Sequence, residues 1–99
     1  MDGYPDFLAH EDGDHVAVAV RDVEPGPALV GYLDGASQLD IDVREAVPLG
    51  HKVALADVSK GADLIEYGIR VGIVSQDITQ GGYVHTHNVR SARWQNSVA

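Results

Sequence analysis

The chain has 99 residues and carries 15 acidic against 7 basic residues, which gives a formal net charge of −8. This length fits one small domain, and an apolar content of 44% is sufficient for a hydrophobic core. The negative charge argues against binding to nucleic acid or to an anionic membrane. The sequence contains no cysteine, which excludes disulfide bonds, thiolate metal sites and a cysteine nucleophile and fits a reducing cytoplasm.

The first residues are acidic, and the apolar run that follows them, residues 7–9, is short. We therefore expect no signal peptide and no membrane span, which would need about 20 apolar residues, and we expect a cytoplasmic protein. All 15 acids lie between Asp2 and Asp77, so residues 78–99 combine two arginines and two histidines with no acid. This asymmetry is either chance in a short segment or a sign that this end meets an anionic ligand or a partner that holds one.

Most of the chain has the pattern of short strands. Residues 1–6 are expected to form a flexible N-terminus. The period-2 alternation of half-buried strands then recurs, with a turn at 11–14 and a hairpin turn at 34–35, over residues 7–10, 15–21, 29–33, 39–44, 51–56, 64–68 and 69–74. Residues 45–50 are predicted to form one helical turn. No helical period lasts for ten residues, so we predict an all-β domain with at most one or two helical turns.

One short pattern occurs three times, beginning at Asp22, Asp57 and Asp77. Each copy has aspartate, a β-branched apolar residue, two variable positions and then glycine. We interpret each copy as a tight corner between two strands, in which the aspartate accepts backbone N–H groups in an Asx-type turn and the glycine adopts a positive φ. The three aspartates are therefore predicted to be structural rather than catalytic.

The segment 83–88 contains two of the five histidines. If it is a strand, Tyr83, His85 and His87 project from one face, with the two histidines about 7 Å apart at the backbone. That spacing is within reach of one metal ion or one small anion.

Four motifs in combination resemble a known family: Gly50-His51-Lys52, Ile65-Glu66-Tyr67-Gly68, the corner at Asp57 and His85-Thr86-His87-Asn88. The chain resembles the SAF (beta-clip) domain of the altronate dehydratase, galactarate dehydratase and sulfolactate sulfo-lyase family. The resemblance covers residues 7–94 and leaves 95–99 as a flexible C-terminus. In that family the domain is either the N-terminal part of a long enzyme or a separate small subunit, and this chain resembles the small subunit, most closely that of the sulfo-lyase.

The resemblance implies a lyase subunit that needs a large catalytic subunit for activity. The reaction is a β-elimination from a small anionic hydroxy acid, which is (2R)-3-sulfolactate or an altronate- or galactarate-type sugar acid. The resemblance also implies a divalent metal ion, Fe²⁺ or a similar one, that the large subunit holds or shares with this chain.

The site residues follow from the same motifs. His51, Lys52, His87 and Asn88 are predicted to be catalytic, and Lys52 also to bind the substrate as a point charge. His85 and His87 are predicted metal ligands, and a third ligand would have to come from another loop or from the partner. The alternatives are a pair of surface histidines, a solvated lysine and an asparagine that caps the strand end.

Further residues near the C-terminus complete the predicted site. Arg90 is predicted to bind the substrate, and Arg93 to contact the substrate or the large subunit. Trp94 is either an interface anchor or part of the domain's own core. The remaining histidines, His10 and His15, are expected to be surface residues.

Two other functions stay open at this stage. SAF-like domains also occur as sugar-binding, pilus-assembly and antifreeze modules, and a purely structural subunit would stabilise the large chain without contributing to catalysis. The sequence does not determine the substrate acid, the general base, the metal, or the oligomeric state, including whether the isolated chain forms a homo-oligomer.

Overall fold

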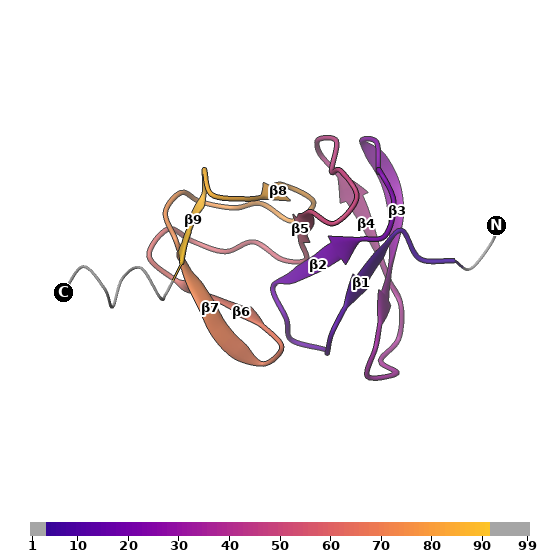
Figure 1. Ribbon diagram of the computed structural model, residues 1–99, viewed down its shortest axis with the longest axis horizontal. Coiled ribbons are helices and arrows are strands. Elements are labelled where there is room, and N and C mark those ends of the chain that lie inside the picture. The colour runs from indigo at the N-terminus through magenta and orange to yellow at the C-terminus, as the bar shows by residue number, and fades with distance from the viewer. Residues whose placement is uncertain (1–3, 92–99) are drawn as a thin grey trace.

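The computed structural model describes residues 4–91, and in this part of the chain nine short strands occur and no helix (Figure 1). The all-β fold class is therefore confirmed. The strands are β1 (Phe7–Ala9), β2 (Val16–Ala19), β3 (Gly26–Tyr32), β4 (Leu39–Val43), β5 (Lys52–Ala54), β6 (Asp63–Glu66), β7 (Ile69–Val74), β8 (Tyr83–Val84) and β9 (Val89–Ser91). It follows that no helix in the described part could cross a membrane.

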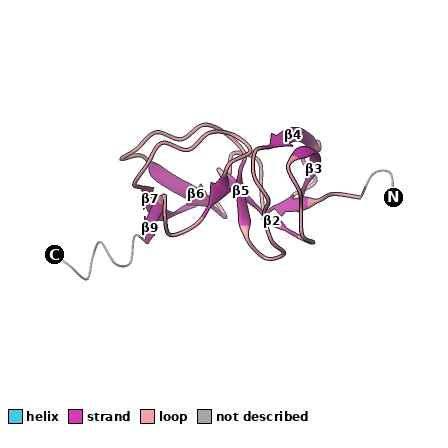
Figure 2. Cartoon of the chain, turned by 90° about the horizontal axis from the view of Figure 1, so that it is seen from above, coloured by secondary structure: helices cyan, strands magenta, loops and turns pink. Residues whose placement is uncertain are grey.

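The strands form two sheets. One has six strands in the order β4-β3-β1-β2-β5-β8, and the other has three in the order β6-β7-β9. Neighbouring strands are antiparallel except for β1 and β3, which pair in parallel. Figure 1 shows β3 and β4 toward one end of the molecule and β7 and β9 toward the other, with β2 and β5 between them. Figure 2 shows the same order from above, with loops connecting the strands.

Strand β5 is buried on both faces at Val53 and Ala54. Val53 belongs to the core cluster that contains Phe7 and Val30, whereas Ala54 belongs to the second cluster, with Leu64 and Val74. Successive side chains of a strand point to opposite faces, so β5 separates two hydrophobic cores. The side chain of residue 52 consequently projects toward the same side as Ala54, where the second sheet lies.

The repeated corners pair with each other. Val58 forms an antiparallel bridge with Ile78, and Val23 forms one with Val47. Val47 lies in residues 45–50, so the predicted helical turn at this position is wrong. This segment is a fourth corner, whose glycine, Gly50, has a φ of 83° like the glycines that end the other three corners.

The aspartates of the corners are structural, but their hydrogen bonds run between corners. The carboxylates of Asp22, Asp57 and Asp77 accept the backbone N–H groups of Leu49, Gln80 and Lys60, each at 2.8 Å. Each donor belongs to the corner that faces the aspartate. The predicted local Asx-type turn is therefore wrong: the pairing of the corners gives each carboxylate a backbone N–H of the facing corner as its partner.

The turn at 11–14, between β1 and β2 of the first sheet, forms hydrogen bonds with the second sheet. Asp14 is buried, and its carboxylate accepts the N–H groups of Tyr67 at 3.0 Å and Gly68 at 3.1 Å, the two residues of the β6–β7 turn. His15 Nδ1 accepts the N–H of Ile65 at 2.9 Å. His15 is thus half-buried and bonded to the backbone of β6, so the expectation of a surface residue holds only in part, whereas His10 is exposed as expected.

Candidate functional site

A cleft of about 350 Å³ lies where the β5 and β8 end of the first sheet meets the second sheet. Its floor is apolar and comes from both sheets, through Leu64, Val71, Val84 and Val89. Polar groups stand on its rim, and they come from the Gly50 corner and from the segment after β8: His51, Lys52, His85 and Thr86. The structure thus brings together two motifs that are far apart in the sequence: His51 and Tyr83, for example, are 32 positions apart.

The corner at Gly50 positions the first two of these residues. The N–H of His51 donates to the carbonyl of Pro48 at 2.9 Å, and its carbonyl accepts the N–H of Ala19 at 2.8 Å. Lys52 then begins β5, between Val18 on one neighbouring strand and Val84 on the other. The backbone on both sides of the His51 side chain is therefore fixed by hydrogen bonds.

Lys52 lines the cleft and pairs with a buried carboxylate. Its Nζ lies 2.6 Å from Oε1 of Glu66, whose side chain is only 7% exposed, whereas the lysine side chain is 39% exposed. The two formal charges cancel locally. The ammonium has three donor hydrogens and uses one on Glu66, so it keeps donors for an anion.

Three imidazoles surround the ring of Tyr83. The phenol oxygen of Tyr83 lies 2.5 Å from Nδ1 of His51. The ring of His85 stacks on that of Tyr83, with centroids 5.6 Å apart and an interplanar angle of 17°, and the ring of His87 lies 5.8 Å away at 39°. The rings of His51 and His85 are also neighbours, at 5.4 Å.

The strand predicted for residues 83–88 ends at Val84, and a turn follows. Asn88 closes this turn: its Oδ1 accepts the N–H of His85 at 3.0 Å, and its Nδ2 donates to the carbonyl of Tyr83 at 2.8 Å. The N–H of Val89 donates to the carbonyl of His85 at 3.1 Å. Local hydrogen bonds of an asparagine side chain thus replace strand pairing, which the period-2 pattern could not indicate.

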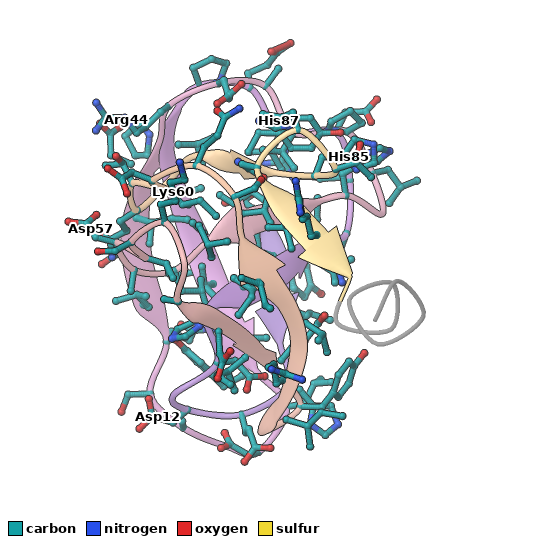
Figure 3. The ribbon with its side chains drawn as sticks, turned by 90° about the vertical axis from the view of Figure 1, so that its left-hand side faces the viewer. Asp12, Arg44, Asp57, Lys60, His85 and His87 are labelled. Atoms are coloured by element: carbon teal, nitrogen blue, oxygen red, sulfur yellow. The ribbon has the colours of Figure 1, made fainter. Side chains whose placement is uncertain are left out.

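The turn separates the two histidines. His85 lines the cleft, whereas His87 lines a polar hollow of about 220 Å³ together with Arg44, Glu45 and Asn88. In Figure 3, His87 lies nearer than His85 to the side of the molecule that carries Arg44. The prediction that His85 and His87 share the face of one strand is therefore wrong.

This arrangement does not fit a metal site formed by the described residues alone. Among residues 4–91, no group of three or more histidine or acidic side chains is placed to hold a metal ion. His85 and His87 open onto different hollows, so they do not converge on one position.

The remaining predicted site residues lie elsewhere. Arg90 is exposed on β9, and it follows Val89, which lines the cleft, so its side chain leaves the opposite face of the strand. Arg93 and Trp94 lie outside the described residues. Asn88 is buried, and both ends of its amide are used in the turn.

Two residues that bond to side chains of the cleft were not assigned a role from the sequence: Glu66, which pairs with Lys52, and Tyr83, which bonds to His51. Glu66 had a signal: it follows Leu64 by two positions in a strand, which places a charged group in a buried register. Tyr83 was expected beside the histidines, but its bond to His51 could not be predicted from spacing.

Comparison with known proteins identifies the family. The family model for the altronate/galactarate dehydratase SAF domain matches residues 5–92. The chain belongs to this SAF-domain family. It is 41% identical over 91 residues to the (2R)-sulfolactate sulfo-lyase subunit alpha of Chromohalobacter salexigens, an alignment that covers 90% of this chain and 97% of the relative.

Other relatives of the SAF domain are similar over different shares of their length. The (2R)-sulfolactate sulfo-lyase subunit alpha of Paracoccus pantotrophus is 38% identical over 58 residues, covering 59% of this chain and 87% of the relative. The altronate dehydratase of Bacillus subtilis is 34% identical over 85 residues, which are 86% of this chain and 16% of that enzyme. The SAF domain thus matches a whole sulfo-lyase subunit but only a small part of a dehydratase, which confirms the family predicted from the motifs.

Proposed function

We propose that the chain is the small subunit of a lyase that performs β-elimination on an anionic hydroxy acid. The observation that carries this proposal is the alignment with 97% of a sulfo-lyase subunit alpha, compared with 16% of an altronate dehydratase. (2R)-3-Sulfolactate is accordingly the first candidate substrate, and an altronate- or galactarate-type sugar acid is the second. The partner is a large catalytic subunit, and the expected location, the cytoplasm, stays a prediction.

The cleft has the chemistry of an anion-binding surface. An elimination next to a carboxylate needs a base for the proton, and it needs donors for the negative charge that develops on the carboxylate and on the leaving group. Lys52 and His51 stand together on the rim of the cleft and supply a cation and an imidazole. Glu66 holds the lysine at the cleft, so its ammonium needs little reorganisation when an anion arrives.

The metal ion implied by the family belongs, in this proposal, to the large subunit. A divalent ion there would act as a Lewis acid toward the substrate carboxylate. The described residues of this chain do not form a metal site, so their contribution is to bind the anion and to close the active site of the partner.

Coexpression with a large subunit of the same family tests the proposal. The complex is assayed for release of sulfite and pyruvate from 3-sulfolactate and, separately, for dehydration of altronate and galactarate. We expect turnover of one substrate class by the complex, and little or none by either chain alone. His51→Ala should lower kcat/KM by about tenfold or more, as expected when a hydrogen bond to a charged group is lost.

His10→Ala is the matched control, because His10 is exposed and lies outside the cleft. An intact complex with unchanged turnover after His51→Ala would instead indicate a purely structural subunit. Binding of a polysaccharide by the isolated chain, without any lyase activity in the complex, would indicate a binding module.

A further inference from the structure

Tyr83 lies on a strand of only two residues, but its backbone makes further hydrogen bonds with side chains. Its N–H donates to the Glu45 carboxylate at 3.3 Å, and its carbonyl accepts from the Asn88 amide at 2.8 Å. Across the sheet it pairs with Val53, in the centre of the first core. The backbone of Tyr83 is therefore held by three separate parts of the chain.

The phenol makes one polar contact in the described part of the chain, at 2.5 Å to Nδ1 of His51. One group of this pair must donate and the other accept. A phenol is a far stronger acid than the N–H of a neutral imidazole, so the arrangement O–H···Nδ1 is the more stable one. A neutral imidazole whose Nδ1 accepts carries its proton on Nε2.

We infer that Tyr83 holds His51 in the tautomer protonated on Nε2, so that His51 presents a hydrogen-bond donor to anionic oxygen in the cleft and is not the general base. Tyr83 is then a positioning residue that acts through His51. The inference rests on the proposed function, because the anion is the substrate of the proposed lyase.

The surroundings of His51 agree with this role. His51 lines the cleft, its Nδ1 is occupied by Tyr83, and Nε2 makes no hydrogen bond within residues 4–91. Lys52 lines the same cleft and supplies a second set of donors, and its ammonium pairs with the buried carboxylate of Glu66. An imidazole N–H and an ammonium that line one cleft are donors suited to a carboxylate or a sulfonate oxygen.

Nitrogen NMR of the full chain with ¹⁵N-labelled histidine tests the tautomer without any need for catalysis. We expect the His51 signals to show a protonated Nε2 and an unprotonated Nδ1, and Tyr83→Phe to convert them to a mixture of tautomers. Tyr67→Phe is the matched control: the Tyr67 ring also contacts an imidazole, that of His10 at 4.3 Å, but makes no hydrogen bond to it. It should leave the His51 signals unchanged.

Kinetics of the complex test the donor role. A glutamine amide can donate near the position of Nε2 but cannot act as a base, so His51→Gln should keep clearly more kcat/KM than His51→Ala. Tyr83→Phe should lower kcat/KM about two- to tenfold, as expected for the loss of one ordinary hydrogen bond. An Nδ1-protonated His51 in the wild type, or equal losses for the glutamine and alanine variants, would overturn the inference. A wild-type complex without lyase activity would contradict the proposed function, while the imidazole signals still decide the tautomer.

Discussion

Asp57 and Asp77 each cap the other's corner. Oδ1 of Asp57 accepts the N–H of Gln80, three residues after Asp77, and Oδ1 of Asp77 accepts the N–H of Lys60, three residues after Asp57. Between them lies the bridge that joins the two corners. This reciprocity makes the pair of corners a single unit of the fold.

We predict that Asp57→Ala and Asp77→Ala each lower the free energy of unfolding by about 1–2 kcal/mol, because each leaves one backbone N–H without its carboxylate. Urea unfolding followed by circular dichroism measures this. Asp40→Ala is the control, since Asp40 is exposed on β4 and should change stability by less than about 0.5 kcal/mol. Equal effects of all three substitutions would contradict the structural role of the capping aspartates.

The other pair of corners, joined by the bridge between Val23 and Val47, shows why the corner at 45–50 was not predicted. Asp22 caps the facing corner at Leu49, but the reciprocal bond is missing. The positions that would form it are Ala46, which has no carboxylate, and Pro25, which has no N–H. The donor and the acceptor are thus absent together. Without its aspartate, the segment 45–50 does not match the repeat, and its proline and glycine resemble the end of a helical turn.

The glycines of two corners offer a matched pair of substitutions. Gly61 and Gly81 have similar φ angles, 89° and 86°, but a Cβ on Gly61 would meet nothing within 4 Å, whereas one on Gly81 would lie 2.0 Å from the carbonyl oxygen of Asp42. We predict that Gly61→Ala costs about 1–2 kcal/mol from the left-handed backbone alone. Gly81→Ala should cost about 1–3 kcal/mol more from the steric clash. Thermal and urea unfolding of both variants checks the order, and a smaller loss for Gly81→Ala would contradict the close packing of this corner on β4.

Lys52 and Glu66 form an ion pair that is exposed at one end only. Lys52→Met would leave the Glu66 carboxylate buried without its partner, so we predict a loss of about 1–3 kcal/mol in the free energy of unfolding, a value reduced for the solvent exposure of the lysine. Adding Glu66→Gln should recover part of this loss, because the buried charge is removed. A double-mutant cycle by urea unfolding measures the coupling.

Lys60→Met serves as the control for this cycle, because Lys60 is exposed and only its backbone N–H is used in a hydrogen bond. If the double variant were as unstable as the sum of its two single variants, the pair would not be coupled, and Glu66 would not be what holds the lysine at the cleft.

The sequence indicates the cleft only in part, for physical reasons that differ between residues. The strand at 39–44 was predicted because its alternation of apolar and charged residues is strict, and β4, with one face buried, confirms it. The segment 83–88 has the same period, yet it turns at His85, because one asparagine amide closes a local loop. Contacts such as that between Tyr83 and His51 depend on how distant corners pair, and no local period encodes them.

The carboxylate of Asp34 connects two turns and should make stability depend on pH. It accepts the N–H of Ala36 at 2.9 Å and that of Asp12 at 3.0 Å, and these bonds, chiefly that from Ala36, lower the pKa of Asp34 below its ordinary value. Because the pKa of Asp34 is lower in the folded state, the ionised carboxylate stabilises the fold. This stabilisation is complete above the ordinary pKa and is lost as the pH falls through the folded pKa.

We therefore predict that the difference in urea midpoint between wild type and Asp34→Asn shrinks as the pH is lowered from about 6 to about 3, across the ordinary pKa range of aspartate. Asp40→Asn, at an exposed position without such bonds, should show no comparable change. A difference that stays constant over this range would mean that the two N–H groups do not favour the ionised carboxylate.

Asn88 determines where His85 and His87 lie, because its amide closes the turn that carries both. Asn88→Ala removes two hydrogen bonds at a buried position, and we predict a loss of about 1–3 kcal/mol in the free energy of unfolding. At neutral pH, the stability of Asn88→Asp should lie between that of the wild type and that of Asn88→Ala, or below both. The aspartate keeps the acceptor for the His85 N–H but sets a carboxylate oxygen against the Tyr83 carbonyl. Thr86→Ala, at an exposed position in the same turn, should have little effect on stability.

Urea unfolding gives these values, and amide hydrogen exchange at His85 shows whether the turn has opened. If Asn88→Ala left both unchanged, the turn would be fixed by the pairing of β8 and β9 with their neighbours, and the asparagine would be free for the substrate.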